Sequence, residues 1–118
     1  MTIKRLESGP RMSQAVVANG FAFLAGQVAT DPTANVEGQT KQILAKIEKV
    51  LANARTDKRR LLSAQIWIKD IAKDFAGMNE IWDAWIVPNA TPARATAQCE
   101  MGAPDVLVEI IVTAAVSQ

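Results

Sequence analysis

Two charged residues interrupt the apolar C-terminal part of the chain and are the first candidates for chemistry. Glu109 lies in the middle of VLVEIIV, where a buried carboxylate is costly unless it is paired or hydrogen-bonded. Arg94 follows Pro92 at the start of the preceding strand-like segment, and its guanidinium can bind a carboxylate through two parallel hydrogen bonds. The two residues are therefore candidates for an ion pair or an anion site. The alternatives are a rim position for Arg94 and a surface position for Glu109.

Other kinds of reactive site are poorly represented in the chain. The sequence has no histidine, which excludes Ser-His and Cys-His nucleophile systems. Its six glycines are scattered and form no phosphate-binding loop, and no acidic cluster suggests a metal site. The single cysteine, Cys99, alternates with Ala95, Ala97 and Met101. We expect it to be a buried structural thiol.

Length and composition indicate a small globular protein. The 118 residues predict one domain covering 1–118, and 49% of them are hydrophobic. The formal net charge of +1 does not favour nucleic acid as a partner. The N-terminal segment MTIKRLESGP has no signal-peptide core, and the apolar runs are too short to span a membrane. We therefore expect a cytoplasmic protein without membrane contact.

The first half of the chain predicts a hairpin followed by a helix. The residues Asn19-Gly20 separate two apolar runs, which is a strong signal for a tight turn between strands. The expected strands cover 13–18 and 21–25, with a short edge strand at 3–6. Apolar residues then recur at steps of three and four through 37–55, which predicts an amphipathic helix.

The second half predicts three more strands and a second helix. Residues 62–68 alternate, with Leu62 on the side of Ala64 and Ile66, and Trp67 on the other side. A helix over 75–86 is expected, capped by Asp70 or Asp74, with an apolar set of Phe75, Met78, Ile81, Trp82 and Trp85. Strands are expected at 92–101 and 106–116, and the last is apolar enough to be buried on both faces.

These elements predict an α+β fold in which two helices cover one face of a single sheet. The other face must then meet solvent or another subunit. Trp82 and Trp85 are expected in the core, whereas Trp67 points to the uncovered face. There it could serve as an intersubunit contact or as a platform for a ligand.

Several segments together resemble the Rid family, the reactive-intermediate deaminases that are also called the YjgF family. They are AGQV at 25–28, IWIKDIAKDFAGMNEIWDAW, the Pro-Ala-Arg triplet ending at Arg94, and the apolar segment around Glu109, which lies 15 residues after that arginine. The resemblance covers essentially the whole chain. MTIKRLESGPRMSQAVV and NEIWDAWIV look most similar to the small YoaB-like branch of the family.

This resemblance implies a chorismate-mutase-like fold, with one mixed sheet and two helices on one face. It also implies a homotrimer whose sheets form a central barrel with clefts between subunits. The family's best-known activity is cofactor-independent hydrolysis of 2-imino acids, such as 2-iminopropanoate, to 2-oxo acids and ammonia. The expected partners are thus small 2-imino or 2-oxo carboxylic acids, and no metal or organic cofactor is expected.

The resemblance also implies roles for individual residues. Arg94 matches the arginine that anchors the substrate carboxylate, and Glu109 matches the carboxylate that positions or deprotonates water. Gly26 matches a cleft segment where the backbone comes close to the ligand. Asn79 matches a recurrent asparagine whose role is either structural or in the cleft. Thr96 lies on the face of Arg94 and could donate a hydrogen bond from the cleft wall.

Three positions depart from the archetypal deaminase of the family. That protein has Tyr at the position of Met12, Ser at Ala25 and Cys at Thr96. Met12 and Ala25 still match the substrate-binding surface but carry no hydroxyl group. The leading hypothesis is therefore imine deamination, and the alternative is a non-catalytic protein of the same fold that binds small carboxylates. RNA cleavage or translation inhibition, the third hypothesis, is opposed by the net charge and the absence of histidine.

Overall fold

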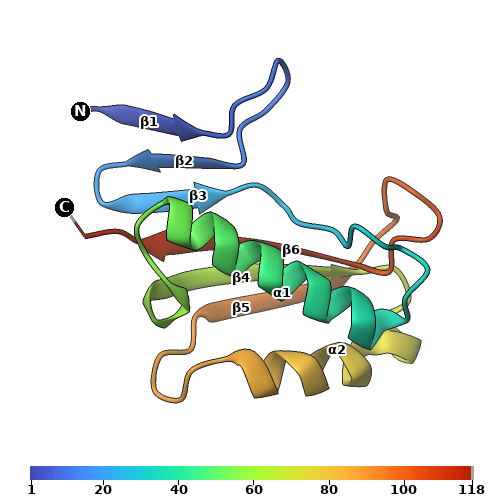
Figure 1. Cartoon of the computed structure of the whole chain (residues 1–118). Coiled ribbons are helices and arrows are strands. Elements are labelled where there is room, and N and C mark those ends of the chain that lie inside the picture. The colour runs from blue at the N-terminus through green and yellow to red at the C-terminus, as the bar shows by residue number, and fades with distance from the viewer. Residues whose placement is uncertain (118) are drawn as a thin grey trace.

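The computed structural model describes residues 1–117 and shows one six-stranded sheet with two helices on one face (Figure 1). The strands are β1 (Ile3–Leu6), β2 (Ala15–Ala18), β3 (Phe21–Leu24), β4 (Leu61–Ile68), β5 (Ala93–Gln98) and β6 (Val108–Ala115). The helices are α1 (Val36–Asn53) and α2 (Ile71–Trp85), with a 3₁₀ turn at Lys58–Arg60. The strand order is β1-β2-β3-β6-β4-β5, and only β4 and β5 pair in parallel. The predicted α+β fold is confirmed.

The turn between β2 and β3 is the one predicted from its sequence. Asn19 and Gly20 have φ angles of 53° and 84°. A two-residue hairpin turn requires such positive φ angles at both residues if it is to match the twist of its strands. Ala18 and Phe21 are paired directly across it. Both strands are shorter than expected. Strand β2 begins at Ala15, and strand β3 ends at its partner Leu24.

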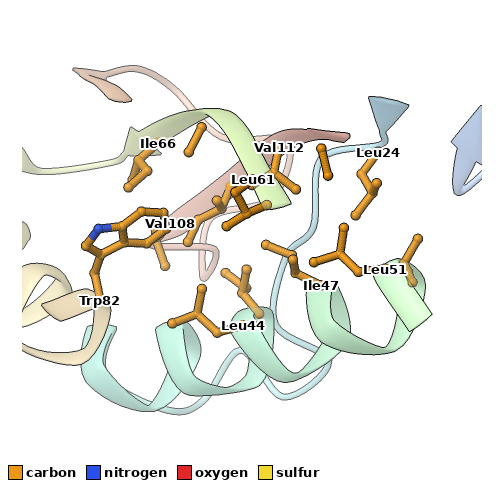
Figure 2. Close-up of a cluster of buried hydrophobic side chains, with 14 of the residues drawn as sticks. Leu24, Leu44, Ile47, Leu51, Leu61, Ile66, Trp82, Val108 and Val112 are labelled. Atoms are coloured by element: carbon orange, nitrogen blue, oxygen red, sulfur yellow. The ribbon is translucent and has the colours of Figure 1, made fainter. Parts of the chain in front are cut away.

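Helix α1 packs its apolar stripe against the sheet. The Asn35 side chain caps its first turn by accepting a hydrogen bond from the Gly38 N–H at 2.9 Å. Figure 2 shows the resulting core, in which the labelled side chains come from both helices and from the sheet: Leu24, Leu44, Ile47, Leu51, Leu61, Ile66, Trp82, Val108 and Val112. As described over residues 1–117, neither helix has the length and apolarity to cross a membrane.

Helix α2 begins earlier than predicted and packs differently at one position. Asp70, rather than Asp74, is its cap and accepts a hydrogen bond from the Lys73 N–H. Met78 and Trp82 are buried as predicted, but Phe75 is 40% exposed. Its assignment to the core is wrong, because the ring lies beside Arg94 at the edge strand β5, and residues 1–117 form no further strand beyond it.

Two predictions about the strands also need correction. The pairing register of β4 shifts between Leu61 and Ser63, so Leu61 enters the core and Leu62 is exposed. Strand β6 is buried only at alternate residues within the single chain, because helices cover one face alone. We call the other side the open face; it carries Ile3, Val16, Phe21, Phe23, Ser63, Gln65, Trp67, Glu109, Ile111 and Thr113.

Gln39 of α1 is a fully buried amide that joins two loops to the helix. Its Nε2 donates to the carbonyl oxygens of Pro32, Ala34 and Asp105, and its Oε1 accepts from the Leu107 N–H, all at 2.9–3.1 Å. These bonds hold the segment that leads into β6 against α1.

Replacing Gln39 by leucine is expected to lower the free energy of unfolding by about 2–4 kcal/mol, because a fully buried amide is removed and four partly buried backbone groups lose their partner. Urea unfolding of the variant measures this loss. Gln42→Leu is the matched control, since Gln42 lies on the same helix and, within the described residues, bonds the Asp31 backbone alone. Equal losses in the two variants would contradict the role given to Gln39.

Candidate functional site

Arg94 lies on the helix-covered face of the sheet. In the parallel pair of β4 and β5 it is opposite the buried Ala64, so its side chain points toward α2. There its Nη1 donates a hydrogen bond to Asn79 Oδ1 at 2.7 Å. The guanidinium carbon is 5.6 Å from the ring centre of Trp82 and 6.0 Å from that of Phe75. An amide and two aromatic rings therefore orient the guanidinium group.

The Arg94 guanidinium keeps donors free for a ligand. Within residues 1–117 its one hydrogen bond goes to Asn79, and no carboxylate pairs with it. Thr96, two residues along the same face, has a buried Oγ1 without a hydrogen-bond partner in that part of the chain. A free guanidinium edge and an unused hydroxyl are suited to a small carboxylate. We call Phe75, Asn79, Trp82, Arg94 and Thr96 the arginine half-site.

Sequence reasoning identified three members of this half-site and missed its aromatic pair. Phe75, Asn79 and Trp82 are spaced by four and three residues on α2, so they share one side of the helix. The same spacing is typical of a core-facing stripe, and Trp82 does lie in the core while its ring also faces Arg94.

Glu109 lies on the open face, directly opposite Trp67 of β4. Its carboxylate occupies the space that a side chain at residue 26 would fill. A Cβ built on Gly26 would be 2.1 Å from Glu109 Oε2 and 3.2 Å from Ile111 Cγ1. Burial raises the pKa of the Glu109 carboxyl above its ordinary value of 4.5. We call Gly26, Trp67, Glu109 and Ile111 the glutamate half-site.

The segment that contains Met12 is connected to the glutamate half-site rather than to Arg94. The Ala25 N–H donates to Gln14 O at 2.9 Å, and Gln27 Nε2 donates to Gln14 Oε1 at 2.9 Å. Met12 lies two residues before Gln14, in the loop between β1 and β2, and its side chain is half-exposed. These strands are at the opposite edge of the sheet from β5 (Figure 1).

Arg94 and Glu109 do not form the ion pair that the sequence left open. Arg94 is opposite Ala64 and Glu109 is opposite Trp67, and these two β4 residues are three apart. Side chains alternate between faces along a strand, so the arginine and the glutamate project from opposite faces. Strand β4 also lies between their two strands. Each residue therefore faces its own surface of the single chain.

Five hollows on the surface of residues 1–117 are lined by other residues, and none of the five includes Arg94 or Glu109. One of them contains Cys99, beside Lys69 and Met101. Cys99 is half-buried, so the expectation of a fully buried thiol is wrong for the single chain. It follows the end of β5, an edge strand of the sheet.

Comparison with known proteins places this geometry in a family. The family model described as Endoribonuclease L-PSP matches residues 2–116. A RutC family protein from Haemophilus ducreyi is 40% identical over 115 residues, covering 98% of this chain and 97% of the relative. The RutC family protein YoaB from Escherichia coli is 38% identical over 116 residues, covering 98% of this chain and all of the relative.

A solved structure agrees with these sequence matches. A member of the YjgF protein family from Neisseria meningitidis superposes with a TM-score of 0.96 at 39% identity, covering 100% of this chain and 98% of that one. The chain belongs to the Rid (YjgF) family. This Rid protein has the fold that the resemblance implied, and family membership supports a deaminase-type or related family function.

Proposed function

We propose that this Rid protein hydrolyses reactive 2-imino acids to 2-oxo acids and ammonium in clefts between identical subunits. The observation that carries the proposal is the arginine half-site. Its guanidinium is oriented by Asn79 and two rings, has free donors, and has no carboxylate partner within residues 1–117. A small carboxylate is the ligand that this arrangement suits best. Glu109 supplies the second function, a partly buried carboxylate beside a glycine.

The opposite orientation of the two half-sites supports an active site shared between copies. A single chain cannot bring both groups to one ligand, so a neighbour must provide the other half. The open face carries exposed Ile3, Phe21, Phe23 and Trp67, and such an apolar surface is typical of an interface. Strand β5 is also an edge strand of the sheet. A homotrimer, as the family resemblance implies, would use both features.

In the proposed reaction, Arg94 holds the carboxylate of a protonated imine and Glu109 of the neighbouring copy holds a water molecule. The water oxygen bonds to the imine carbon, the C=N π electrons move to nitrogen, and Glu109 accepts the water proton. Glu109 then gives this proton to the amine nitrogen. The hydroxyl oxygen forms the C=O bond as the C–N bond breaks, ammonia leaves, and the hydroxyl proton passes to it. The net change is iminium acid plus water to 2-oxo acid plus ammonium.

The direct test is acceleration of imine hydrolysis. An amino-acid oxidase generates the 2-imino acid in solution, and the appearance of the 2-oxo acid is followed with and without this protein. We expect a faster rate than spontaneous hydrolysis, proportional to protein concentration. A rate equal to the spontaneous one for every imino acid would reject the deaminase assignment.

The second candidate function is binding of small carboxylates without turnover. Met12 and Ala25, which stand where the archetypal deaminase has hydroxyl side chains, favour it. Calorimetric titration with 2-oxo acids separates the candidates. Binding without imine hydrolysis would support the binding protein, whereas no binding at millimolar ligand would remove both proposals for the arginine half-site.

Gly26→Ala is expected to reduce kcat about 100-fold while the protein stays folded, since displacement of a catalytic group by about 1 Å has effects of this size. The new methyl group would occupy the position of Glu109 Oε2 and move the carboxylate. Imine hydrolysis and thermal unfolding are measured together. Gly102→Ala is the matched control, because a Cβ there meets no atom within 4 Å. Unchanged kcat in Gly26→Ala would contradict the role of Glu109.

A further inference from the structure

We propose that the Trp67 indole forms one wall of a pocket for the substrate's side chain. The protein should then prefer 2-imino and 2-oxo acids with bulky apolar side chains, branched or aromatic, over the three-carbon acids. This inference rests on the proposed function, because it assumes that the reacting carbon lies beside Glu109.

The sheet register places the indole next to the proposed water-binding carboxylate. Trp67 and Glu109 are directly opposite each other on adjacent antiparallel strands, and such pairs have Cβ atoms about 4.5–5.5 Å apart on the same face. Ile111 is the next open-face residue on β6, and its Cγ1 borders the same space above Gly26. The immediate surroundings of the carboxylate are therefore an indole, an aliphatic side chain and a glycine.

The geometry of an imino acid determines what must occupy this space. The imine carbon is planar and carries three groups: the carboxylate, the nitrogen and the side chain. Arg94 of one copy holds the carboxylate, and water at Glu109 of the other copy approaches perpendicular to the plane. The side chain must then extend across the open face near Glu109. The nearest polar side chain on that face in β4, Gln65, lies one pair further away, opposite Ile111.

The exposure of Trp67 gives this contact an energetic basis. The residue is 38% exposed in the single chain, so an apolar ligand group that covers it removes indole surface from water. A methyl group, the side chain of a three-carbon acid, covers little of it. A branched or aromatic group covers more, and such differences commonly change kcat/KM by about 10- to 200-fold.

The same indole could instead be a contact between subunits, and the experiment is designed to distinguish the two roles. Imine hydrolysis is measured for the imino acids of alanine, leucine and phenylalanine, and binding is measured by calorimetry for the corresponding 2-oxo acids. Wild type is compared with Trp67→Ala, Trp67→Phe and Phe21→Ala, with oligomeric state recorded by light scattering. Phe21 is the matched control: it is an aromatic residue on the same face, 40% exposed, but paired with Ala115, six residues beyond Glu109.

We expect wild type to favour the two bulky acids, and Trp67→Ala to reduce this preference about 10- to 100-fold while Phe21→Ala retains it. A wild-type preference for the three-carbon acid would overturn the inference, as would the same preference in Trp67→Ala and wild type. If Trp67→Ala dissociates, the assembled Trp67→Phe protein decides. If Trp67→Phe prefers the bulky acids as strongly as wild type does, Trp67 is only a subunit contact. If its preference is weaker than that of wild type, the pocket is supported.

Failure of this inference is distinguishable from failure of the proposed function. Hydrolysis of all three imino acids without a size preference leaves the deaminase assignment intact and removes the side-chain pocket. If bulky 2-oxo acids bind in a way that depends on Trp67 but no imino acid is hydrolysed, the side-chain pocket is retained and the deaminase assignment is removed. No binding of any 2-oxo acid overturns the pocket as well as the anion site.

Discussion

Arg94→Ala is expected to remove about 3–5 kcal/mol of transition-state stabilisation, which is roughly a 150- to 5,000-fold loss in kcat/KM for 2-imino acids. The guanidinium is the only group of its half-site with a positive charge, and its free donors are aimed at no internal carboxylate in residues 1–117. Without it, no positive charge in that half-site holds the substrate's negative end. Steady-state kinetics of imine hydrolysis measures the loss.

Two further variants define what Arg94 contributes. Arg94→Lys keeps the charge but not the planar fork, so it should recover only part of the rate. Arg59→Ala is the control for removal of an arginine, because Arg59 is exposed and pairs with Asp57 at 2.9 Å. It should leave the rate unchanged. Full activity of Arg94→Ala would show that the carboxylate is bound elsewhere.

Glu109→Gln is expected to lower kcat by about 100- to 10,000-fold, the range typical of losing a general base. The amide keeps the shape of the side chain next to Gly26 but cannot accept the water proton. The control is Glu48→Gln, an exposed glutamate on α1 whose salt bridge to Lys58 spans 3.9 Å. If Glu109→Gln is as active as wild type, Glu109 is not the general base and solvent water accepts the proton.

The raised pKa of Glu109 gives this prediction a pH signature. The base must be ionised, so the wild-type rate should fall as the pH decreases through the raised pKa, and the residual rate of Glu109→Gln should lack this step. Stability changes in the opposite direction. Burial favours the protonated carboxyl in the folded state, so the folded protein loses stability as the pH rises from 4.5 through the raised pKa. Glu109→Gln should therefore be more stable than wild type at neutral pH, which urea unfolding at several pH values measures.

Much of the fold follows from local patterns that a single sequence displays. The Asn19-Gly20 turn, the helical repeat of α1 and the alternation of β4 each arise from neighbouring residues. The boundaries were less accurate because strand ends depend on pairing. A register shift at Leu61 and Ser63 is set by the neighbouring strand β6, and nothing within LLSAQIWI alone indicates it.

The site was predictable as residue types but not as an arrangement. Arg94 and Glu109 stood out because each interrupts an apolar pattern. Which face each occupies depends on how β5 and β6 align with β4, and that alignment is a property of the assembled sheet. Phe75 shows the same limit: its helical spacing fits a core position, yet the sheet ends before it is covered.

The separation of arginine and glutamate onto opposite faces has a genetic consequence. In the proposed assembly each chain gives its arginine to one cleft and its glutamate to a different one. A cell with two alleles, one altered only at Arg94 and the other only at Glu109, would produce mixed assemblies in which an intact arginine meets an intact glutamate. Two alleles that are inactive by themselves would thus complement each other within one oligomer.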